Sequence, residues 1–136
     1  MLGRRLIILM TIILWSVFSN AQVTFVIDSF PKDTVQNSAI FISGDFEGWS
    51  GGQEDYKLQR HKNHYFITLP EQKGAINFKF TNGSWETVET DNAYNQIENR
   101  QYTFNKPNDT VKVEIKNWNK GKIPHSTASE NVKLFY

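Results

Sequence analysis

The chain has 136 residues, a formal net charge of +1 and no cysteine, and 14% of its residues are aromatic. A chain of this length accommodates one domain rather than two. The lack of cysteine excludes a disulfide framework, a thiol nucleophile, cysteine-ligated zinc and a lipid-attachment cysteine, and the charge balance argues against broad nucleic-acid affinity.

Residues 1–21 are predicted to be a signal peptide. Arg4 and Arg5 precede the largely apolar run 6–18, and small residues at 19–21 form a cleavage site. The apolar run is shorter than the roughly 20 residues that a membrane span needs. Cleavage removes two of the 15 basic residues and none of the 14 acidic ones, so the net charge becomes −1. We therefore expect an exported protein, periplasmic or secreted, with no membrane attachment after cleavage and no nucleic-acid partner.

The rest of the chain is predicted to consist of strands and turns. Alternation of inward and outward residues, typical of strands with one buried face, occurs in residues 23–27, 40–42, 65–69, 76–80 and 111–115. Turn-forming clusters separate these runs at residues 31–33, 50–52, 62–63, 72–74, 82–83 and 107–109. About seven short strands with this spacing predict an all-β, immunoglobulin-like antiparallel β-sandwich over residues 22–118. Trp118 closes the last run and is expected to pack into the core.

Residues 119–136 are predicted to be a linker or tail. Residues 119–130 contain Gly, Pro, Ser, Thr and Lys with almost no apolar side chains, as linkers and frayed ends do. The chain then ends on Leu134, Phe135 and Tyr136. Two interpretations stay open: the chain is the front part of a longer protein, or the tail folds back onto the sandwich.

Enzymatic motifs for metalloproteases, serine hydrolases, phosphate-binding loops and calcium loops do not occur in the sequence. His61 and His64 lie at a predicted hairpin tip, where two histidines are typically solvated, and His125 lies in the tail. A glycosidase needs two carboxylates at a fixed separation in a cleft. We therefore expect no catalytic residue, no metal and no cofactor, and interpret as solvated charges the carboxylates Glu47, Glu54, Asp55, Glu86, Glu89, Asp91 and Glu98.

Two tryptophans are predicted to lie outside the core. Trp49 stands between glycine-containing turns, where few sequence neighbours can bury it. Trp85 faces outward if its segment is a strand and Val88 faces the core, because side chains on a strand alternate. The same alternation places Lys79 on the outer face of the run 76–80. A patch of two indoles and a lysine suits a sugar, because the rings offer flat apolar area and the polar groups bond hydroxyls.

A series of motifs, in order along the chain, has a counterpart in one known family. The motifs are Ile40-Phe41-Ile42-Ser43-Gly44-Asp45-Phe46-Glu47-Gly48-Trp49, Tyr65-Phe66-Ile67-Thr68-Leu69-Pro70, Ile76-Asn77-Phe78-Lys79-Phe80, Gly83-Ser84-Trp85-Glu86 and Asn99-Arg100. Together they resemble the starch-binding domains of carbohydrate-binding module families 20 and 48, including the glycogen-binding domain of AMP-activated kinase. The resemblance covers residues 39–118.

The resemblance implies a binding site for α-1,4-glucan. Trp49 and Trp85 would stack on sugar rings, and Lys79 and Asn99 would bond their hydroxyls. Glu86 would be a further polar contact. The segment between Trp85 and Asn99 is longer than in many starch-binding domains, and it offers alternatives to Asn99 in Asn92, Asn95 and Gln96.

Three functions follow as hypotheses. The first is non-catalytic binding of a starch-like or glycogen-like α-glucan. The second is that the chain is the truncated N-terminal module of a secreted esterase or amylase, with a catalytic domain in longer relatives. Residues 128–133 resemble the junction between such modules and esterase domains in secreted Bacteroidetes hydrolases. The third is a protein-interaction sandwich, which predicts that Trp49 or Trp85 is buried or that the two lie far apart.

Overall fold

The computed structural model describes residues 21–32, 34 and 38–120. Within these residues the chain forms two short 3₁₀-helices, η1 (Glu54–Tyr56) and η2 (Trp85–Thr87), and nine strands. The strands are β1 (Val23–Ser29), β2 (Phe41–Gly44), β3 (Gln59–His61), β4 (His64–Leu69), β5 (Ala75–Thr81), β6 (Glu89–Thr90), β7 (Arg100–Thr103), β8 (Asp109–Glu114) and β9 (Asn117–Trp118). Neither helix of this described part is long or apolar enough to cross a membrane.

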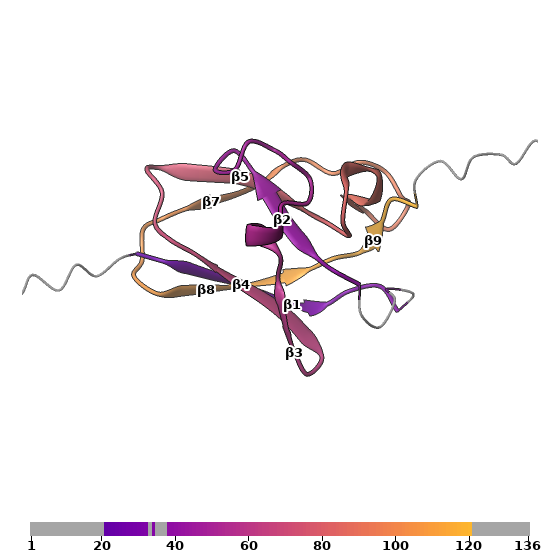
Figure 1. The fold of residues 1–136 in the computed structure, drawn as a ribbon, viewed down its shortest axis with the longest axis horizontal. Helices are drawn as coiled ribbons and strands as arrows, with labels where there is room; N and C mark the ends of the chain where they lie inside the picture. Colours follow the sequence, from indigo (N-terminus) through magenta and orange to yellow (C-terminus); the bar gives the residue numbers. More distant parts are fainter. Residues whose placement is uncertain (1–20, 33, 35–37, 121–136) are drawn as a thin grey trace, which may run out of the picture.

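The strands form two main layers that face each other (Figure 1). One sheet has the order β3-β4-β1-β8, the other has the order β2-β5-β7, and β6 pairs with β9 in a small third sheet. The inward side chains of β1 and β5 meet between the layers. The ring of Phe25 lies 4.7 Å from that of Phe78 and 6.3 Å from that of Phe80. The all-β sandwich predicted from the sequence is therefore confirmed.

Period-two alternation locates the strands that carry most of the core. In β1, Val23, Phe25 and Ile27 are fully buried, and the burial pattern alternates as the sequence predicts. In β5, Ile76 and Phe80 face inward in the same way. Trp118 is also buried, and its indole Nε1–H donates to the Thr34 hydroxyl at 2.9 Å. The expectation that Trp118 packs into the core is confirmed.

Two details of the sandwich differ from the prediction. The structure describes nine strands rather than about seven, because β3, β6 and β9 are too short for alternation to reveal them. The sheets are also not wholly antiparallel, since β1 pairs with β8 in parallel, with Phe25 opposite Val111. The segment between these strands contains the whole second sheet, which gives the long connection that a parallel pair requires.

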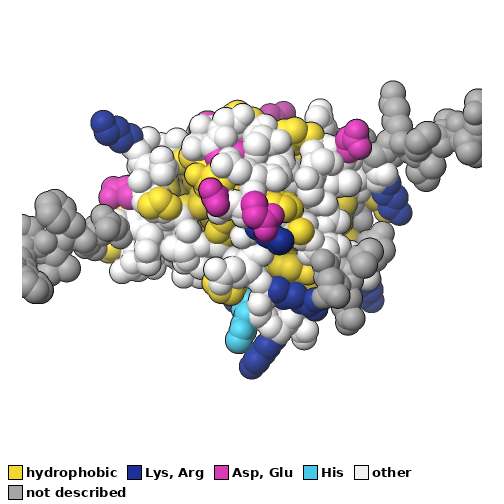
Figure 2. Space-filling view, in the orientation of Figure 1, with side chains coloured by type: hydrophobic (Ala, Val, Ile, Leu, Met, Phe, Trp, Pro, Cys, Tyr) yellow, Lys and Arg dark blue, Asp and Glu magenta, His cyan; other side chains and the backbone are white. Residues whose placement is uncertain are grey.

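The predicted hairpin of His61 and His64 is confirmed. The two residues pair across the turn between β3 and β4, and their rings lie 5.4 Å apart. Figure 2 shows histidine side chains at the tip where Figure 1 draws this hairpin. In the described part of the chain no group of three or more His, Asp or Glu side chains gathers as a metal site would. His125, residues 121–136 of the tail and residues 1–20 of the predicted signal peptide lie outside the described residues.

Candidate functional site

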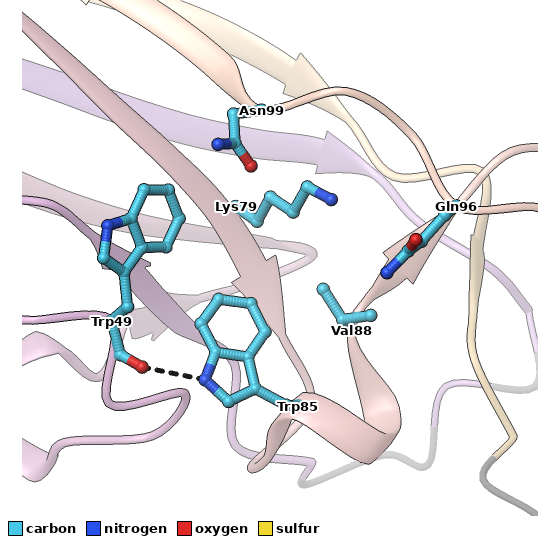
Figure 3. A pocket seen from close by; sticks show the side chains of 6 residues that line it. All are labelled: Trp49, Lys79, Trp85, Val88, Gln96 and Asn99. Atoms are coloured by element: carbon cyan, nitrogen blue, oxygen red, sulfur yellow. Dashed lines mark hydrogen bonds between the residues drawn. The ribbon is translucent and has the colours of Figure 1, made fainter.

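A cavity of about 300 Å³ opens on the outer side of the β2-β5-β7 sheet (Figure 3). Its lining residues come from three separate parts of the chain: Trp49, Lys79, Trp85, Val88, Gln96 and Asn99. The two indole rings lie side by side, with centroids 6.0 Å apart and planes tilted by 37°. In Figure 3 the Lys79 side chain runs past both rings, with Asn99 on one side and Gln96 beyond its ammonium. Four of the five residues predicted for the site therefore share one cavity.

The loop that carries Trp49 is held by Glu47. One carboxylate oxygen of Glu47 accepts hydrogen bonds from the Ser43 hydroxyl, from the Gly44 amide at 3.0 Å and from the Ser50 amide at 3.0 Å. The Trp49 amide donates to the Gly44 carbonyl at 3.0 Å. Trp49 itself has φ 57°, a left-handed conformation that costs a bulky residue about 1–2 kcal/mol. The Glu47 network bridges both ends of this strained segment and so compensates that cost.

The interpretation of Glu47 as a solvated charge is thus wrong. Burial alone would raise the pKa of the Glu47 carboxyl, but the hydrogen bonds from Ser43, Ser50 and Gly44 together hold that pKa below its usual value. The signal that sequence reasoning missed is a carboxylate between two serines in a glycine-rich turn, where short polar side chains and free amides converge.

Replacing Glu47 with alanine is expected to lower the free energy of unfolding by about 1–2 kcal/mol at neutral pH, because the loop amides lose their acceptor. Glu47→Gln keeps one acceptor oxygen and should lose less. Since the folded-state pKa of Glu47 is depressed, its stabilisation is present above the unfolded-state pKa and is lost as pH falls through the folded-state value. Urea unfolding at neutral pH and in acid measures both effects.

The matched control for Glu47 is Glu98→Ala, which removes the same charge from an exposed position. Glu98→Ala is expected to leave stability within about 0.5 kcal/mol of the wild type. Equal unfolding midpoints for Glu47→Ala and Glu98→Ala would contradict the assigned role of the Glu47 network.

Trp85 is positioned by η2 and by the loop that carries Trp49. The Trp85 Nε1–H donates to the Trp49 carbonyl at 2.8 Å, the dashed line in Figure 3. The prediction that Trp85 faces outward is confirmed, since 37% of the residue is exposed. The premise of that prediction is wrong, because Trp85–Thr87 is a 3₁₀-helix rather than a strand. The Ser84 amide donates to the Thr87 hydroxyl at 3.3 Å and so stabilises this turn.

Gly51 lies directly under the Trp85 indole. A Cβ atom at Gly51 would come within 2.7 Å of the indole Cδ1 and 2.8 Å of Nε1, and Gly51 has φ +85°. The Gly51 amide donates to the Ser43 hydroxyl at 2.9 Å, and its carbonyl accepts from the Thr81 hydroxyl. These bonds hold the loop against β2 and β5, so close to Trp85 that no side chain fits between the loop and the indole.

Gly51→Ala is therefore expected to displace the Trp85 indole and to break its hydrogen bond to Trp49. The backbone conformation adds a cost of about 1–2 kcal/mol. Gly74→Ala is the matched control, since Gly74 has φ +75° and no atom within 4 Å of its Cβ position. Gly74→Ala should lose only the backbone cost in urea unfolding and Gly51→Ala should lose more, and only Gly51→Ala should change the near-ultraviolet circular dichroism of the tryptophans. An unchanged tryptophan signal in Gly51→Ala would contradict the packing described here.

Lys79 lies on the predicted face of β5 but is not exposed as expected. Only 9% of the residue is accessible, because the Gly51 loop and the tryptophans cover this side of the strand. The apolar part of the side chain is thus buried while its end reaches the cavity, as long cationic side chains commonly do. Within the described residues, no hydrogen bond or ion pair engages the Lys79 ammonium. Its three N–H donors are available to a ligand in the cavity.

The opposite wall of the cavity is fixed by a buried ion pair. Glu89 is 1% exposed, and its carboxylate accepts from Arg100 Nε at 2.9 Å and from Nη2 at 2.8 Å. The same carboxylate accepts from the Phe80 amide at 2.9 Å. The interpretation of Glu89 as a solvated charge is therefore wrong. Because Glu89 follows Val88 and Arg100 follows Asn99, the pair ties together the segments that carry two lining residues.

The remaining predicted residues divide between the cavity and its surroundings. Gln96, an alternative to Asn99 from the sequence, lines the cavity together with Asn99. Asn92 and Asn95 do not line it, and the Asn95 amide instead donates to Asp91 Oδ1 at 2.9 Å. Asp91 thus organises a turn rather than standing as a solvated charge.

Glu86 and Val88 show where sequence reasoning about the site was least complete. Glu86 is exposed on η2 and is not among the lining residues, so a ligand would have to extend beyond the cavity to reach it. The prediction for Trp85 took as a condition that Val88 faces the core, and Val88 is indeed only 5% exposed. Its side chain nevertheless forms part of the cavity wall. The turn formed by η2 brings Val88 beside Trp85, and hydrophobic periodicity in the sequence does not predict that turn.

The side chains that line the cavity are complementary to a neutral, polar ligand that has an apolar face. Two indoles supply flat area, Lys79 supplies donors, and the Gln96 and Asn99 amides supply both donors and acceptors. The residues that line this cavity include no carboxylate. The protein-interaction hypothesis predicted a buried or distant tryptophan. The adjacent rings and the exposure of Trp85 do not agree with that expectation.

Comparison with known proteins indicates a role related to carbohydrates. No family model matches the chain. An alpha-amylase of Niallia circulans is 36% identical to it over 99 residues, which are 71% of this chain and 8% of the amylase. The chain thus spans a small fraction of that relative, and the similarity indicates a carbohydrate-related role in coarse terms only.

Proposed function

We propose that the chain is a non-catalytic module that binds α-glucan chains of the starch or glycogen type. The observation that carries this proposal is the pair of indoles, 6.0 Å apart, beside a lysine with no partner among the described residues. Sugar rings would stack on Trp49 and Trp85, and Lys79, Asn99 and Gln96 would bond their hydroxyls. The motif series shared with starch-binding domains and the similarity to an amylase both support an α-glucan as the ligand.

The proposal makes the chain an accessory domain rather than an enzyme. The 99 aligned residues amount to one small domain and to 8% of the amylase. A module of this size with one shallow cavity would bind modestly by itself. Linked to a catalytic domain, it would raise the effective concentration of substrate at that domain. Because residues 1–21 are predicted to be a signal peptide, we propose that the module acts after export. A hydrolase domain encoded in frame downstream would identify the chain as an N-terminal module.

Native affinity electrophoresis tests the proposal with the purified protein. Soluble amylopectin or glycogen in the gel is expected to retard the protein, whereas a β-linked glucan such as hydroxyethylcellulose is not. Bovine serum albumin in a neighbouring lane controls for sieving by the polymer. Unretarded migration in both α-glucans would refute the proposal. Retardation by the β-linked polymer alone would show that the protein binds a different class of glycan.

A further inference from the structure

The two histidines at the tip of the β3-β4 hairpin form a cross-strand pair. His61 ends β3, His64 begins β4, and the two are direct partners in the register. Directly opposed residues of an antiparallel pair project from the same face, with Cβ atoms about 4.5–5.5 Å apart. The imidazole rings accordingly lie side by side, with centroids 5.4 Å apart and planes tilted by 57°. The rings are therefore close together without being stacked face to face.

The hairpin holds this pair in position. Its strands are joined by the two residues Lys62 and Asn63, and Lys62 has φ 52°, a positive value that tight hairpin turns commonly require. Next to the tip, Tyr65 is only 4% exposed and anchors the base of the hairpin in the core. Arg60 is the register partner of Tyr65, and its guanidinium lies 5.7 Å from the centroid of that ring. Because side chains alternate along a strand, Arg60 and Tyr65 lie on the face opposite the histidines.

Both imidazoles are accessible. His61 is exposed and His64 is half-buried, and Figure 2 shows histidine side chains at the protruding tip. Among the described residues neither ring has a hydrogen-bond or ion-pair partner, and the two rings contact each other. A neutral imidazole has one nitrogen that is not protonated and can bind a metal ion. The tip of the hairpin therefore offers two nitrogen ligands a short distance apart.

From this geometry we propose that His61 and His64 chelate a divalent transition-metal ion of the class of Zn²⁺, Cu²⁺ and Ni²⁺. At a metal–nitrogen bond of about 2.0–2.1 Å, two imidazoles on one tetrahedral ion have ring centroids about 5 Å apart. The 5.4 Å of this pair is close to that separation. Imidazole suits these ions, whereas Mg²⁺ and Ca²⁺ prefer oxygen ligands. The described chain groups no third His, Asp or Glu with the pair, so water completes the coordination and the ion exchanges readily.

This metal site is separate from the glucan cavity. The hairpin belongs to the β3-β4-β1-β8 sheet, whereas the cavity lies on the outer side of the β2-β5-β7 sheet. Strand β3 is a short, exposed edge strand that pairs with β4, and a metal ion bridging its last residue to β4 holds it in the sheet. Because the ion binds the closed hairpin better than the unfolded chain, it stabilises the fold by mass action.

Isothermal titration calorimetry with zinc chloride tests the site, on protein purified without a histidine tag. One Zn²⁺ per chain is expected to bind, and equal concentrations of Mg²⁺ or Ca²⁺ should not compete. His61→Gln and His64→Gln should each weaken Zn²⁺ binding at least about tenfold, since loss of even an outer-shell partner of a metal costs about 10–100-fold. The matched control is His125→Gln, which removes the third histidine of the chain and should bind Zn²⁺ as the wild type does. Circular dichroism confirms that each variant is folded.

Nuclear magnetic resonance locates the ion. Substoichiometric Cu²⁺ is expected to broaden the backbone amide signals of residues 60–65 before those of the rest of the chain. Three results would overturn the proposal: no Zn²⁺ binding by the wild type, undiminished binding by both His61→Gln and His64→Gln, or loss of binding in His125→Gln. Since neither hairpin histidine lines the glucan cavity, both variants should still be retarded by amylopectin as the wild type is.

Discussion

Glu89→Ala is expected to lower the free energy of unfolding by about 3 kcal/mol, the largest stability change of any substitution considered for this protein. The carboxylate is 1% exposed and accepts bonds from Arg100 and from the Phe80 amide. Its removal takes the carboxylate acceptor from the Phe80 amide and leaves the guanidinium with only its bond to the Glu114 carbonyl. Breaking a buried pair typically costs about 3–5 kcal/mol. The lower end applies because the Arg100 side chain is 29% exposed. Urea unfolding followed by tryptophan fluorescence measures the loss.

The chain offers matched controls for this prediction. Glu54→Ala breaks the exposed pair with Lys57, whose side chains are 77% and 44% accessible, and should cost at most about 0.5 kcal/mol. A Glu89→Met, Arg100→Met double variant leaves no charge unpaired and should be more stable than Glu89→Ala alone. A Glu89→Ala protein as stable as Glu54→Ala would overturn the role of the pair. Because the pair joins the segments of Val88 and Asn99, Glu89→Ala should also weaken glucan binding.

Trp85→Ala is expected to reduce affinity for amylopectin by about 30-fold or more. Aromatic anchors that a ligand covers on binding commonly contribute at least about 2 kcal/mol. This substitution also removes the hydrogen bond from Trp85 Nε1 to the Trp49 carbonyl. Trp49→Ala should produce a similar loss, whereas Trp85→Phe should lose less because a stacking face remains. Isothermal titration calorimetry with soluble amylopectin compares the three.

Phe66→Ala is the control for removing an aromatic side chain elsewhere. Phe66 is half-buried in β4, in the other sheet, and does not line the cavity. It should bind amylopectin as the wild type does, provided that circular dichroism shows it folded. Undiminished binding by both Trp49→Ala and Trp85→Ala would show that glucan, if bound, is held elsewhere.

Strands of this fold can be predicted where the alternation of buried and exposed residues is visible within a short stretch of sequence. Strands β1, β4 and β5 alternate clearly, because each has one face in the core, and the sequence predicts them within two residues. Strand β7 has no such pattern, since Tyr102 is the only large apolar residue in Arg100–Thr103. Short pairs such as β6 with β9 exist only because distant segments meet. No window of the sequence contains that information.

The site was predictable in its residue types and less so in its surroundings. Trp49, Trp85 and Asn99 could be named from motifs and turns, and they converge as expected. The burial of Lys79 could not be foreseen, because it results from the loop of Gly51 crossing β5. The roles of Glu47 and Glu89 were also missed, because their hydrogen-bond donors meet them only in the folded chain. From the sequence alone a carboxylate is interpreted as solvated, because the amides and the guanidinium that donate to it are identified only in the structure.

We propose that the cavity between Trp49 and Trp85 holds α-glucan, and a crystal structure with maltoheptaose would show whether it does. We expect glucose rings stacked on both indoles, with the Lys79 ammonium and the Asn99 amide within hydrogen-bonding distance of their hydroxyls. Sugar bound only at other surfaces would contradict the claim. So would an empty cavity at a maltoheptaose concentration that saturates the protein in solution.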